Sequence, residues 1–179
     1  MGEDGLRHQL LDAAGRILDE SGIEAVTIRE TARQCGVSHG APRRHFPSRA
    51  VLLGHLAKRV AGELAEEFDA TDGDPLRLAE VYVAFAARRP HAFDLLLRHD
   101  LLEASGADLR STTLPLVARW RDAWCARHPA DSGTDALVRL TAVHGIASLV
   151  SHRAHEVVGL EPGELLGRVL RSGNFSEGM

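Results

Sequence analysis

The sequence has little of what disulfide-rich and membrane proteins need. Its 179 residues include two cysteines, Cys35 and Cys125, which lie far apart and form no metal-type spacing. That usage favours buried thiols in a reducing compartment. No uninterrupted apolar run approaches the roughly 18 residues that cross a bilayer. The acidic start MGEDGLRH carries neither an export signal nor a myristoylation signal. We therefore expect a cytoplasmic protein without a membrane partner.

Sequence signatures of catalysis are also missing. The chain has no Gly-flanked serine elbow, no Gly-rich phosphate loop and no persuasive pair of carboxylates. His152, His155 and Glu156 lie close together, but HEVVG has Gly where the HExxH zinc motif needs its second His. We interpret these three as surface residues or subunit contacts, with metal binding as the alternative. The sequence thus predicts no enzyme, no metal site and no cofactor.

The apolar residues that are present follow helical spacing. They make up 44% of the chain, which is enough for a buried core. One stripe over residues 6–18 stops at Ser21-Gly22 and predicts a first helix. Another stripe over residues 52–68 follows Ser48 and predicts a long, serine-capped fourth helix. Since no run shows strand alternation, the predicted fold class is all-α.

Two shorter helices are expected between these long ones. Thr27, with Glu30 three residues on, has the capping-box arrangement, and Gly36 closes this second helix. Ser38 would cap a third helix with the sequence HGAPRRHF, which Pro47 ends. Two short helices joined by a tight turn behind a longer helix form a helix-turn-helix unit. The sequence therefore predicts an N-terminal three-helix helix-turn-helix domain, joined by a fourth helix to a C-terminal helical bundle.

Positive charge is concentrated in the helix-turn-helix region. Residues 29–59 contain seven Arg or Lys residues and one Glu, a net charge of +6, whereas the whole chain has a net charge of -4. Such an asymmetry indicates a local site for a polyanion on an acidic protein. The alternative is an accident of charge placement. We expect the polyanion to be double-stranded DNA, because a recognition helix fits the major groove.

Residues 8 to 60 resemble one family of DNA-binding proteins. The stretch DESGIEAVTIRETARQCGVS, followed by HGAPRRHFPSRAVLLGHL, is similar to the N-terminal domain of TetR (tetracycline-repressor-type) transcriptional regulators. Further on, YVAFAARRPHAFDLLL and AVHGIASL resemble the subclass whose C-terminal domain is named for a Trp-His-Gly signature. His144 and Gly145 fit that signature, although the preceding stretch LVRLTAV contains no Trp.

The resemblance implies a ligand-responsive, homodimeric regulator. It would be a repressor that binds a palindromic DNA operator and is released by a small-molecule effector. On this interpretation residues 1–47 are the helix-turn-helix DNA-binding domain, residues 48–69 the connecting helix, and residues 74–172 the ligand-binding and dimerisation domain. Helices over residues 137–158 and 165–170 would pack against their mates in the dimer.

Base readout is expected from the exposed face of the third helix. Arg44 is the first candidate for a base contact, and Arg43 stands where most family members have Tyr. Gly40 and Ala41 would let the backbone approach the duplex, or they reflect only the composition of a helix start. The candidate DNA contacts on this helix are Ser38, His39, Gly40, Ala41, Arg43 and Arg44.

Further candidates are expected to hold the phosphate backbone. Thr27 and Ser38 lie at helix N-termini, which attract phosphate, although capping alone would explain both residues. The resemblance assigns backbone contacts to His45 and Arg49. For Arg44, a solvated surface charge is the alternative to a base contact.

The effector site is expected among the aromatic residues of the second half. Pockets between bundle helices are apolar with a few polar groups. For each aromatic residue, packing in the core is the alternative. The candidate ligand contacts are Tyr82, Phe85, Phe93, Trp120, Trp124 and His144.

The competing hypothesis for the whole chain is an all-α small-molecule binding module, or a small helical enzyme, without specific DNA binding. A binding module of that kind would leave the positive segment over residues 29–59 unexplained.

Overall fold

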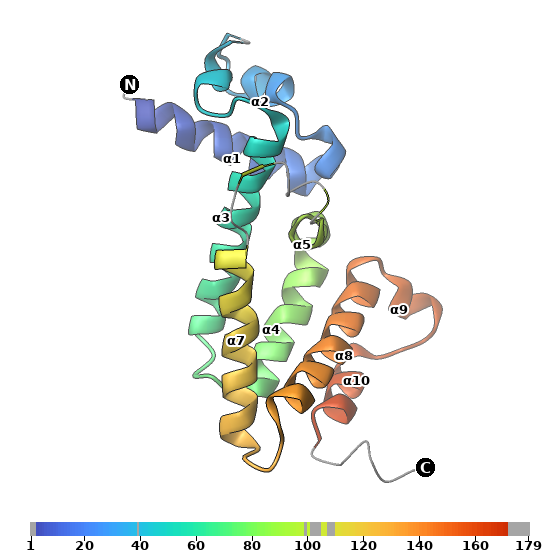
Figure 1. Cartoon of the computed structure of the whole chain (residues 1–179). Helices are drawn as coiled ribbons and strands as arrows, with labels where there is room; N and C mark the ends of the chain where they lie inside the picture. The colour runs from blue at the N-terminus through green and yellow to red at the C-terminus, as the bar shows by residue number, and fades with distance from the viewer. Residues whose placement is uncertain (1–2, 39, 99, 101–104, 107–109, 172–179) are drawn as a thin grey trace. The chain divides into compact units, whose positions relative to one another are not determined.

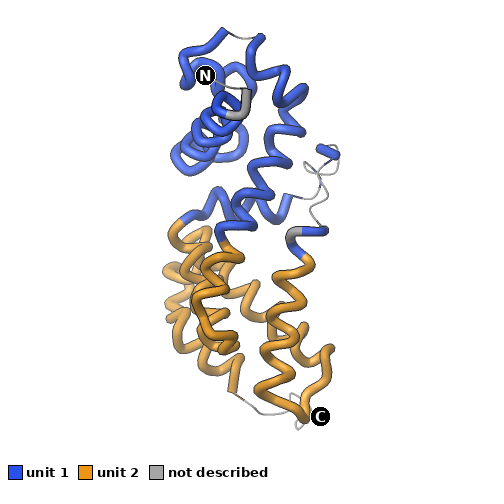
Figure 2. Tube along the Cα trace, turned by 90° about the vertical axis from the view of Figure 1, so that its left-hand side faces the viewer, with its two compact units in different colours: residues 1–63, 89–113 blue, residues 64–88, 114–179 orange. Residues whose placement is uncertain are grey.

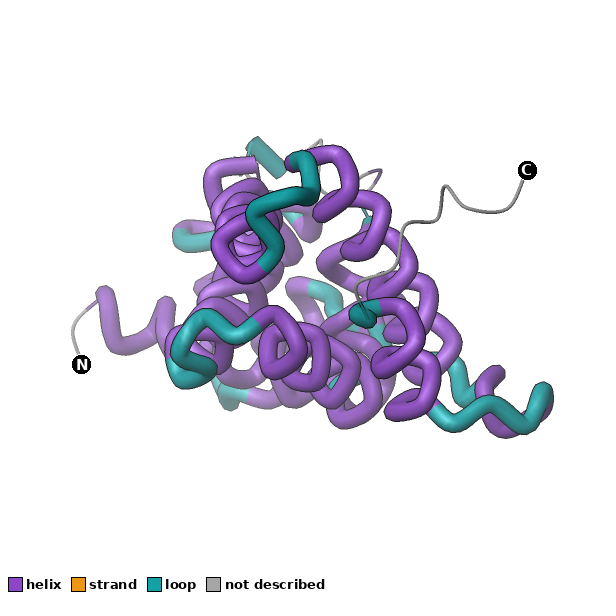
Figure 3. Tube along the Cα trace, turned by 90° about the horizontal axis from the view of Figure 1, so that it is seen from below, coloured by secondary structure: helices purple, strands orange, loops and turns teal. Residues whose placement is uncertain are grey.

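The computed structural model describes residues 3–38, 40–98, 100, 105–106 and 110–171, and these ranges form helices joined by loops, with no strand among them (Figures 1 and 3). The predicted all-α fold class is confirmed. The helices are α1 (Glu3–Ser21), α2 (Ile28–Gln34), α3 (Arg49–Asp69), α4 (Pro75–Arg88), α5 (Pro90–Leu97), α7 (Arg110–Arg127), α8 (Gly133–Ser151), α9 (Ala154–Val157) and α10 (Pro162–Val169), with the 3-10 helices η1 (Ile23–Ala25) and η2 (Ala41–Arg44).

The chain divides into two compact units (Figure 2). Unit 1 comprises Met1–Glu63 and Arg89–Thr113, and unit 2 comprises Leu64–Arg88 and Leu114–Met179. The border therefore falls within α3, and α5 belongs with the N-terminal helices. Arg89 contributes to this grouping, because its guanidinium binds the carboxylates of Asp19 on α1 and Glu63 on α3. Residues 1–2 and 172, at the ends of the predicted domains, lie outside the described residues.

The two long helices α1 and α3 follow the predicted stripes. The apolar residues of α1 face the core, with Leu10 and Leu18 fully buried. The stripe of α3 is buried as well, from Leu52 to Phe68. The predicted serine cap of α3 is confirmed, because the Ser48 hydroxyl accepts a hydrogen bond of 3.2 Å from the Val51 N–H.

The second helix begins and ends as predicted. The Thr27 hydroxyl accepts the Glu30 N–H at 3.1 Å, which caps α2. The return half of the capping box is not made, since the Glu30 carboxylate instead accepts bonds of 2.8 and 2.5 Å from Arg33. Gly36 follows α2 with φ of +65°, a conformation that favours glycine.

The third helix is shorter and tighter than predicted. The expected α-helix HGAPRRHF is replaced by η2, which covers only Ala41–Arg44. Pro42 has no backbone N–H to donate, and Gly40 has low helix propensity, so the sequence cannot sustain several α-helical turns. The segment is nevertheless closed at its end, because the His45 and Phe46 N–H groups donate to the Pro42 carbonyl at 3.0 and 2.8 Å.

In unit 2, α4 packs against α8 and α10. The prediction of one continuous helix over residues 137–158 was wrong. The chain leaves α8 after Ser151, and Arg153 adopts a left-handed conformation with φ of +56° before the single turn of α9. No Gly or Pro in the sequence announces this break. The Ser132 hydroxyl and the Asp135 carboxylate form a complete capping box at the start of α8.

Candidate DNA-binding and effector sites

The recognition segment, defined as residues 41–46, presents its basic residues to solvent. Arg43 and Arg44 are exposed, whereas Pro42 is buried and Phe46 has 0% of its surface exposed. The buried pair fixes one side of the segment in the core of unit 1, so the two guanidinium groups extend from the other side.

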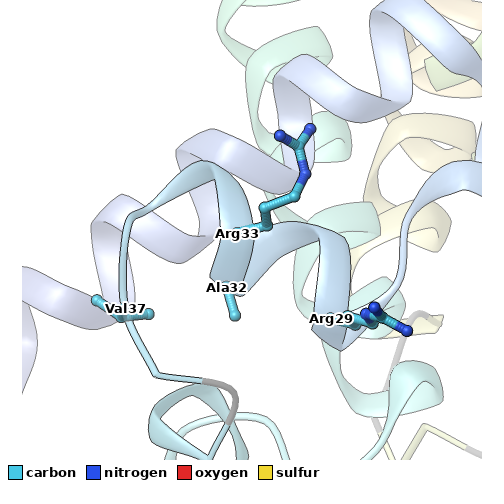
Figure 4. Close-up of a pocket in the computed structure, with 4 residues that line it drawn as sticks. All are labelled: Arg29, Ala32, Arg33 and Val37. Carbon is cyan, nitrogen blue, oxygen red and sulfur yellow. The ribbon is translucent and has the colours of Figure 1, made fainter.

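An open hollow of about 430 Å³ lies beside α2 and is lined by Arg29, Ala32, Arg33 and Val37 (Figure 4). The Arg33 side chain extends away from Ala32 in this view. Arg29 and Arg33 were counted in the positive segment but not predicted as site residues. Their spacing of four places them on one side of α2, which was the available signal. Arg33 shares its charge with Glu30, so Arg29 is the stronger addition to the candidate DNA surface.

The polar residues at the helix starts serve the local backbone. Thr27 caps α2, and its carbonyl also accepts the Thr31 hydroxyl at 2.8 Å. The Ser38 carbonyl accepts the Ala41 N–H at 3.0 Å, and the residue is exposed. The Thr27 bond fits the capping alternative. The predicted Ser38 cap was wrong, because Gly40 is the N-cap of η2 and no side chain of the described residues caps that helix. Phosphate contacts by Thr27 and Ser38 stay a prediction.

The small residues at the start of the recognition segment leave space outside the backbone. A Cβ atom added at Gly40 would meet no heavy atom of the described residues within 4 Å. Ala41 and His45 are half-buried, and the His45 ring centroid lies 6.5 Å from that of Phe46. His39, the remaining candidate of this segment, lies outside the described residues.

Arg49 is engaged with the backbone of its own unit. Its Nε donates to the Val26 carbonyl at 2.8 Å and its Nη2 to the Ile23 carbonyl at 2.7 Å. Nη2 also lies 3.2 Å from the Glu24 carboxylate. Arg49 therefore ties the first turn of α3 to η1, and a contact with DNA phosphate stays a prediction.

Two of the predicted effector residues form a polar pair in unit 2. The Tyr82 hydroxyl on α4 lies 2.9 Å from Nδ1 of His144 on α8. Burial raises the pKa of Tyr82 to about 12 and lowers the pKa of His144. Both groups are thereby held neutral at physiological pH. The Tyr82 ring also lies 6.5 Å from that of Phe68.

The two tryptophans are packed together with their polar atoms bonded. Their ring centroids are 6.0 Å apart and stacked. Trp120 Nε1 donates to the Ala136 carbonyl at 2.8 Å, and Trp124 Nε1 donates to Asp131 at 2.9 Å. The Arg139 guanidinium lies 4.7 Å from the Trp124 ring centroid. Contacts of this kind suit a packed core.

The last two effector candidates belong to different units. Phe85 lies on α4 in unit 2, and Phe93 lies on α5 in unit 1. Both side chains have 0% of their surface exposed. The structure thus brings together Tyr82 with His144 and Trp120 with Trp124, while a ligand contact by any of the six stays a prediction.

The His152, His155 and Glu156 group binds nearby protein atoms. His152 Nδ1 lies 2.9 Å from the Ser148 carbonyl, and Glu156 pairs with Arg153. Across the described residues, no group of three His, Cys, Asp or Glu side chains could hold a metal ion. In the same part of the chain, no helix combines the length and apolar character needed to cross a membrane.

Helix α2, the turn at Gly36 and the exposed arginines of η2 are the arrangement expected of a helix-turn-helix DNA-binding protein of the all-α class. Residues 10–56 match the family model described as bacterial regulatory proteins, tetR family. Over these residues the chain is similar to the tetR family. The narrower Trp-His-Gly subclass stays a prediction.

Among the proteins similar to this chain are two from bacteria. The HTH-type transcriptional regulator PksA of Bacillus subtilis is 25% identical over 162 residues, which are 79% of this chain and 76% of PksA. The nucleoid occlusion factor SlmA of Vibrio vulnificus is 31% identical over 105 residues, which are 54% of this chain and 53% of SlmA.

Solved structures share the fold. The protein SCO4313 has a TM-score of 0.69 at 20% identity, with 94% of both chains covered. The structure of BioQ with its double-stranded DNA operator has a TM-score of 0.59 at 22% identity, with 92% of this chain and 96% of BioQ covered. The multidrug binding protein EbrR, solved with imidazole, has a TM-score of 0.64 at 19% identity, with 96% of this chain and 98% of EbrR covered. At these identities the likeness concerns the fold.

Proposed function

We propose that this protein is a tetR-family transcriptional regulator, a homodimeric repressor that binds a palindromic DNA operator and leaves it when a small-molecule effector binds. The observation that carries the proposal is the recognition segment, in which Arg43 and Arg44 are exposed while Phe46 is buried. Exposed guanidinium groups on an anchored segment suit guanine edges and phosphates. Because it acts on bacterial DNA, the proposal includes a cytoplasmic location.

The DNA surface of the proposal comprises base-reading and backbone-binding residues. Arg43 and Arg44 read bases, and Gly40 and Ala41 allow a close approach to the groove. His39 is proposed to contact the groove. The residues proposed to contact the phosphate backbone are Thr27, Ser38, His45, Arg49 and Arg29. The predicted domain boundaries of residues 1–47, 48–69 and 74–172 belong to the same proposal.

A homodimer follows from the need for sufficient base contacts. One recognition segment offers too few of them, whereas a two-fold pair reads two half-sites about one helical turn apart. α8 presents Leu137 and Val138 to solvent, 42% and 51% exposed, which suits a subunit contact. That BioQ was solved with its operator supports DNA binding by proteins of this fold.

The effector half of the proposal concerns unit 2. An apolar or aromatic small molecule would select the dimer conformation whose recognition segments no longer match successive major grooves. The neutral Tyr82–His144 pair offers one hydrogen-bonding group in apolar surroundings. The structure of EbrR with imidazole supports small-molecule binding by this fold.

The experiment that tests the proposal is sequencing of genomic DNA fragments retained by the purified protein. We expect a palindromic motif, which direct binding measurements then use as the operator. Arg43→Ala and Arg44→Ala should weaken operator binding. Arg168→Ala removes an exposed arginine of unit 2 that pairs with Glu164, and it serves as the control. Retention of random sequence by the wild type, or an equal loss in the control, would refute specific readout by the recognition segment.

A further inference from the structure

Three side chains from separate elements meet behind the recognition segment. The Phe46 ring is fully buried, and the His55 ring of α3 contacts it edge-on at a centroid distance of 5.6 Å. The Arg7 guanidinium of α1 lies 5.7 Å from the Phe46 ring centroid. Arg7 Nη2 also lies 3.1 Å from Nδ1 of His55. Arg7 and His55 thus bracket the aromatic ring that anchors the segment.

The protonation state of His55 follows from the chemistry of its partner. A guanidinium only donates hydrogen bonds, so Nδ1 of His55 must be the acceptor. An acceptor nitrogen carries a lone pair, which requires a neutral imidazole with its proton on Nε2. Protonation of Nδ1 would remove the acceptor and set two cations against each other.

The surroundings of His55 also favour its neutral form. Burial contributes most, followed by the positive charges of Arg7 on α1 and Lys58 on α3, and together they lower the pKa of His55 below its usual 6.5. Because the pKa in the folded state is depressed, the contact is complete above about pH 6.5 and is lost as pH falls through the lowered value.

The ring cluster is connected to the recognition segment through the backbone. The Phe46 N–H donates to the Pro42 carbonyl at 2.8 Å, and Pro42 lies within η2 next to Arg43. A shift of the Phe46 ring therefore moves the same turn that carries Arg43 and Arg44. These contacts all lie within unit 1.

We propose that the Arg7–His55 hydrogen bond is a proton-sensitive contact that positions the recognition segment, so that protonation of His55 weakens operator binding. Arg7 and His55 are positioning residues, which act through Phe46 and do not touch the DNA. The effect on operator binding rests on the proposed function, but the movement of the segment does not.

The first experiment therefore uses the full chain without DNA. NMR titration from about pH 8 to about pH 5 brackets the ordinary histidine pKa of about 6.5 and follows the His55 ring together with the amides of residues 41–46. We expect the amides to shift with the pKa of His55. In His55→Asn, whose amide oxygen replaces the Nδ1 acceptor without titrating, these shifts should disappear. Amides that titrate unchanged in His55→Asn would overturn the proposal.

The second experiment measures operator affinity over the same pH range. Protonation of histidines near DNA strengthens binding to a polyanion in every variant. The effect of His55 is therefore the difference between the pH profiles of the wild type and His55→Asn. Relative to His55→Asn, the wild type should lose up to about tenfold in affinity per pH unit below the pKa of His55, because one proton is involved. His8→Asn, an exposed histidine of α1, is the control and should follow the wild type. Parallel pH profiles for the wild type and His55→Asn would refute the coupling.

Arg7→Gln provides an independent variant, since it retains N–H donors and removes the charge. The pKa of His55 should rise in this variant, and the pH-dependent loss of affinity should move to higher pH. An unchanged His55 titration would contradict the contact itself. If no DNA sequence binds at any pH while the amides still titrate with His55, the proposed function fails and the positioning contact stands.

Discussion

Replacing Trp124 by Ala tests whether this side chain packs the core of unit 2 or lines an effector pocket. Trp124 is 1% exposed, stacks on His128 at a centroid distance of 4.1 Å and lies beneath the guanidinium of Arg139. Removal of a buried Trp costs about 3–5 kcal/mol. Arg139, which is 5% exposed, would also lose a desolvated cation–π contact worth about 2 kcal/mol. We expect a loss near the upper end of the first range.

The loss is measurable because a domain of this size is stable by only about 5–15 kcal/mol. Urea unfolding followed by circular dichroism gives the free energy of unfolding, and Trp120 remains as a fluorescent probe. The control variant Trp124→Phe keeps an aromatic ring and loses the hydrogen bond to Asp131, so it should cost only about 1–2 kcal/mol. A Trp124→Ala protein that loses less than about 1 kcal/mol and no longer binds an effector would refute the packing argument.

Three further predictions concern the DNA surface and pH. Arg44→Ala should weaken operator binding by about 1–3 kcal/mol and relax the preference at one base pair, whereas an equal loss on random DNA would indicate a phosphate contact. Arg49→Ala should lower affinity for all sequences and reduce the slope of log K against log salt by about 1, and an unchanged slope would contradict a phosphate role. Burial lowers the pKa of His144, so part of the stability should be present above about pH 6.5 and lost as pH falls through the lowered pKa. In His144→Gln, the free energy of unfolding measured in urea should lack this pH-dependent contribution. A pH profile equal to that of the wild type would contradict a contribution from His144.

The long helices could be predicted because their signals are local and repeated. In α3 a buried stripe from Leu52 to Phe68 recurs at helical spacing, and Ser48 supplies its cap. Thr27 and Gly36 mark the two ends of α2 by equally local chemistry, a side-chain oxygen and a residue that accepts positive φ. Helices with a capping residue and several turns of an apolar stripe can therefore be predicted from sequence.

The structure differs from the sequence-based predictions where the local conformational preference is weak or is opposed by contacts distant in sequence. η2 has four residues, too few to show a period, and its form depends on the burial of Pro42 and Phe46 in the core. The end of α8 depends on a non-glycine residue, Arg153, in the left-handed region, where propensity would not place it. The Glu30 carboxylate completes no capping box because Arg33 competes for it one turn later.

Sequence spacing does not predict which groups a long side chain of the candidate site binds. Arg49 shows why. The resemblance assigns Arg49 to phosphate, while the structure gives its Nε and Nη2 to the Val26 and Ile23 carbonyls. These two roles are compatible in one guanidinium, which has five N–H donors in a fixed fork. Among the described residues Nη1 makes no hydrogen bond, so its two donors can meet a phosphate while the others stay bound to η1. Arg49 would then be held in place before DNA arrives, which reduces the entropy cost of the contact.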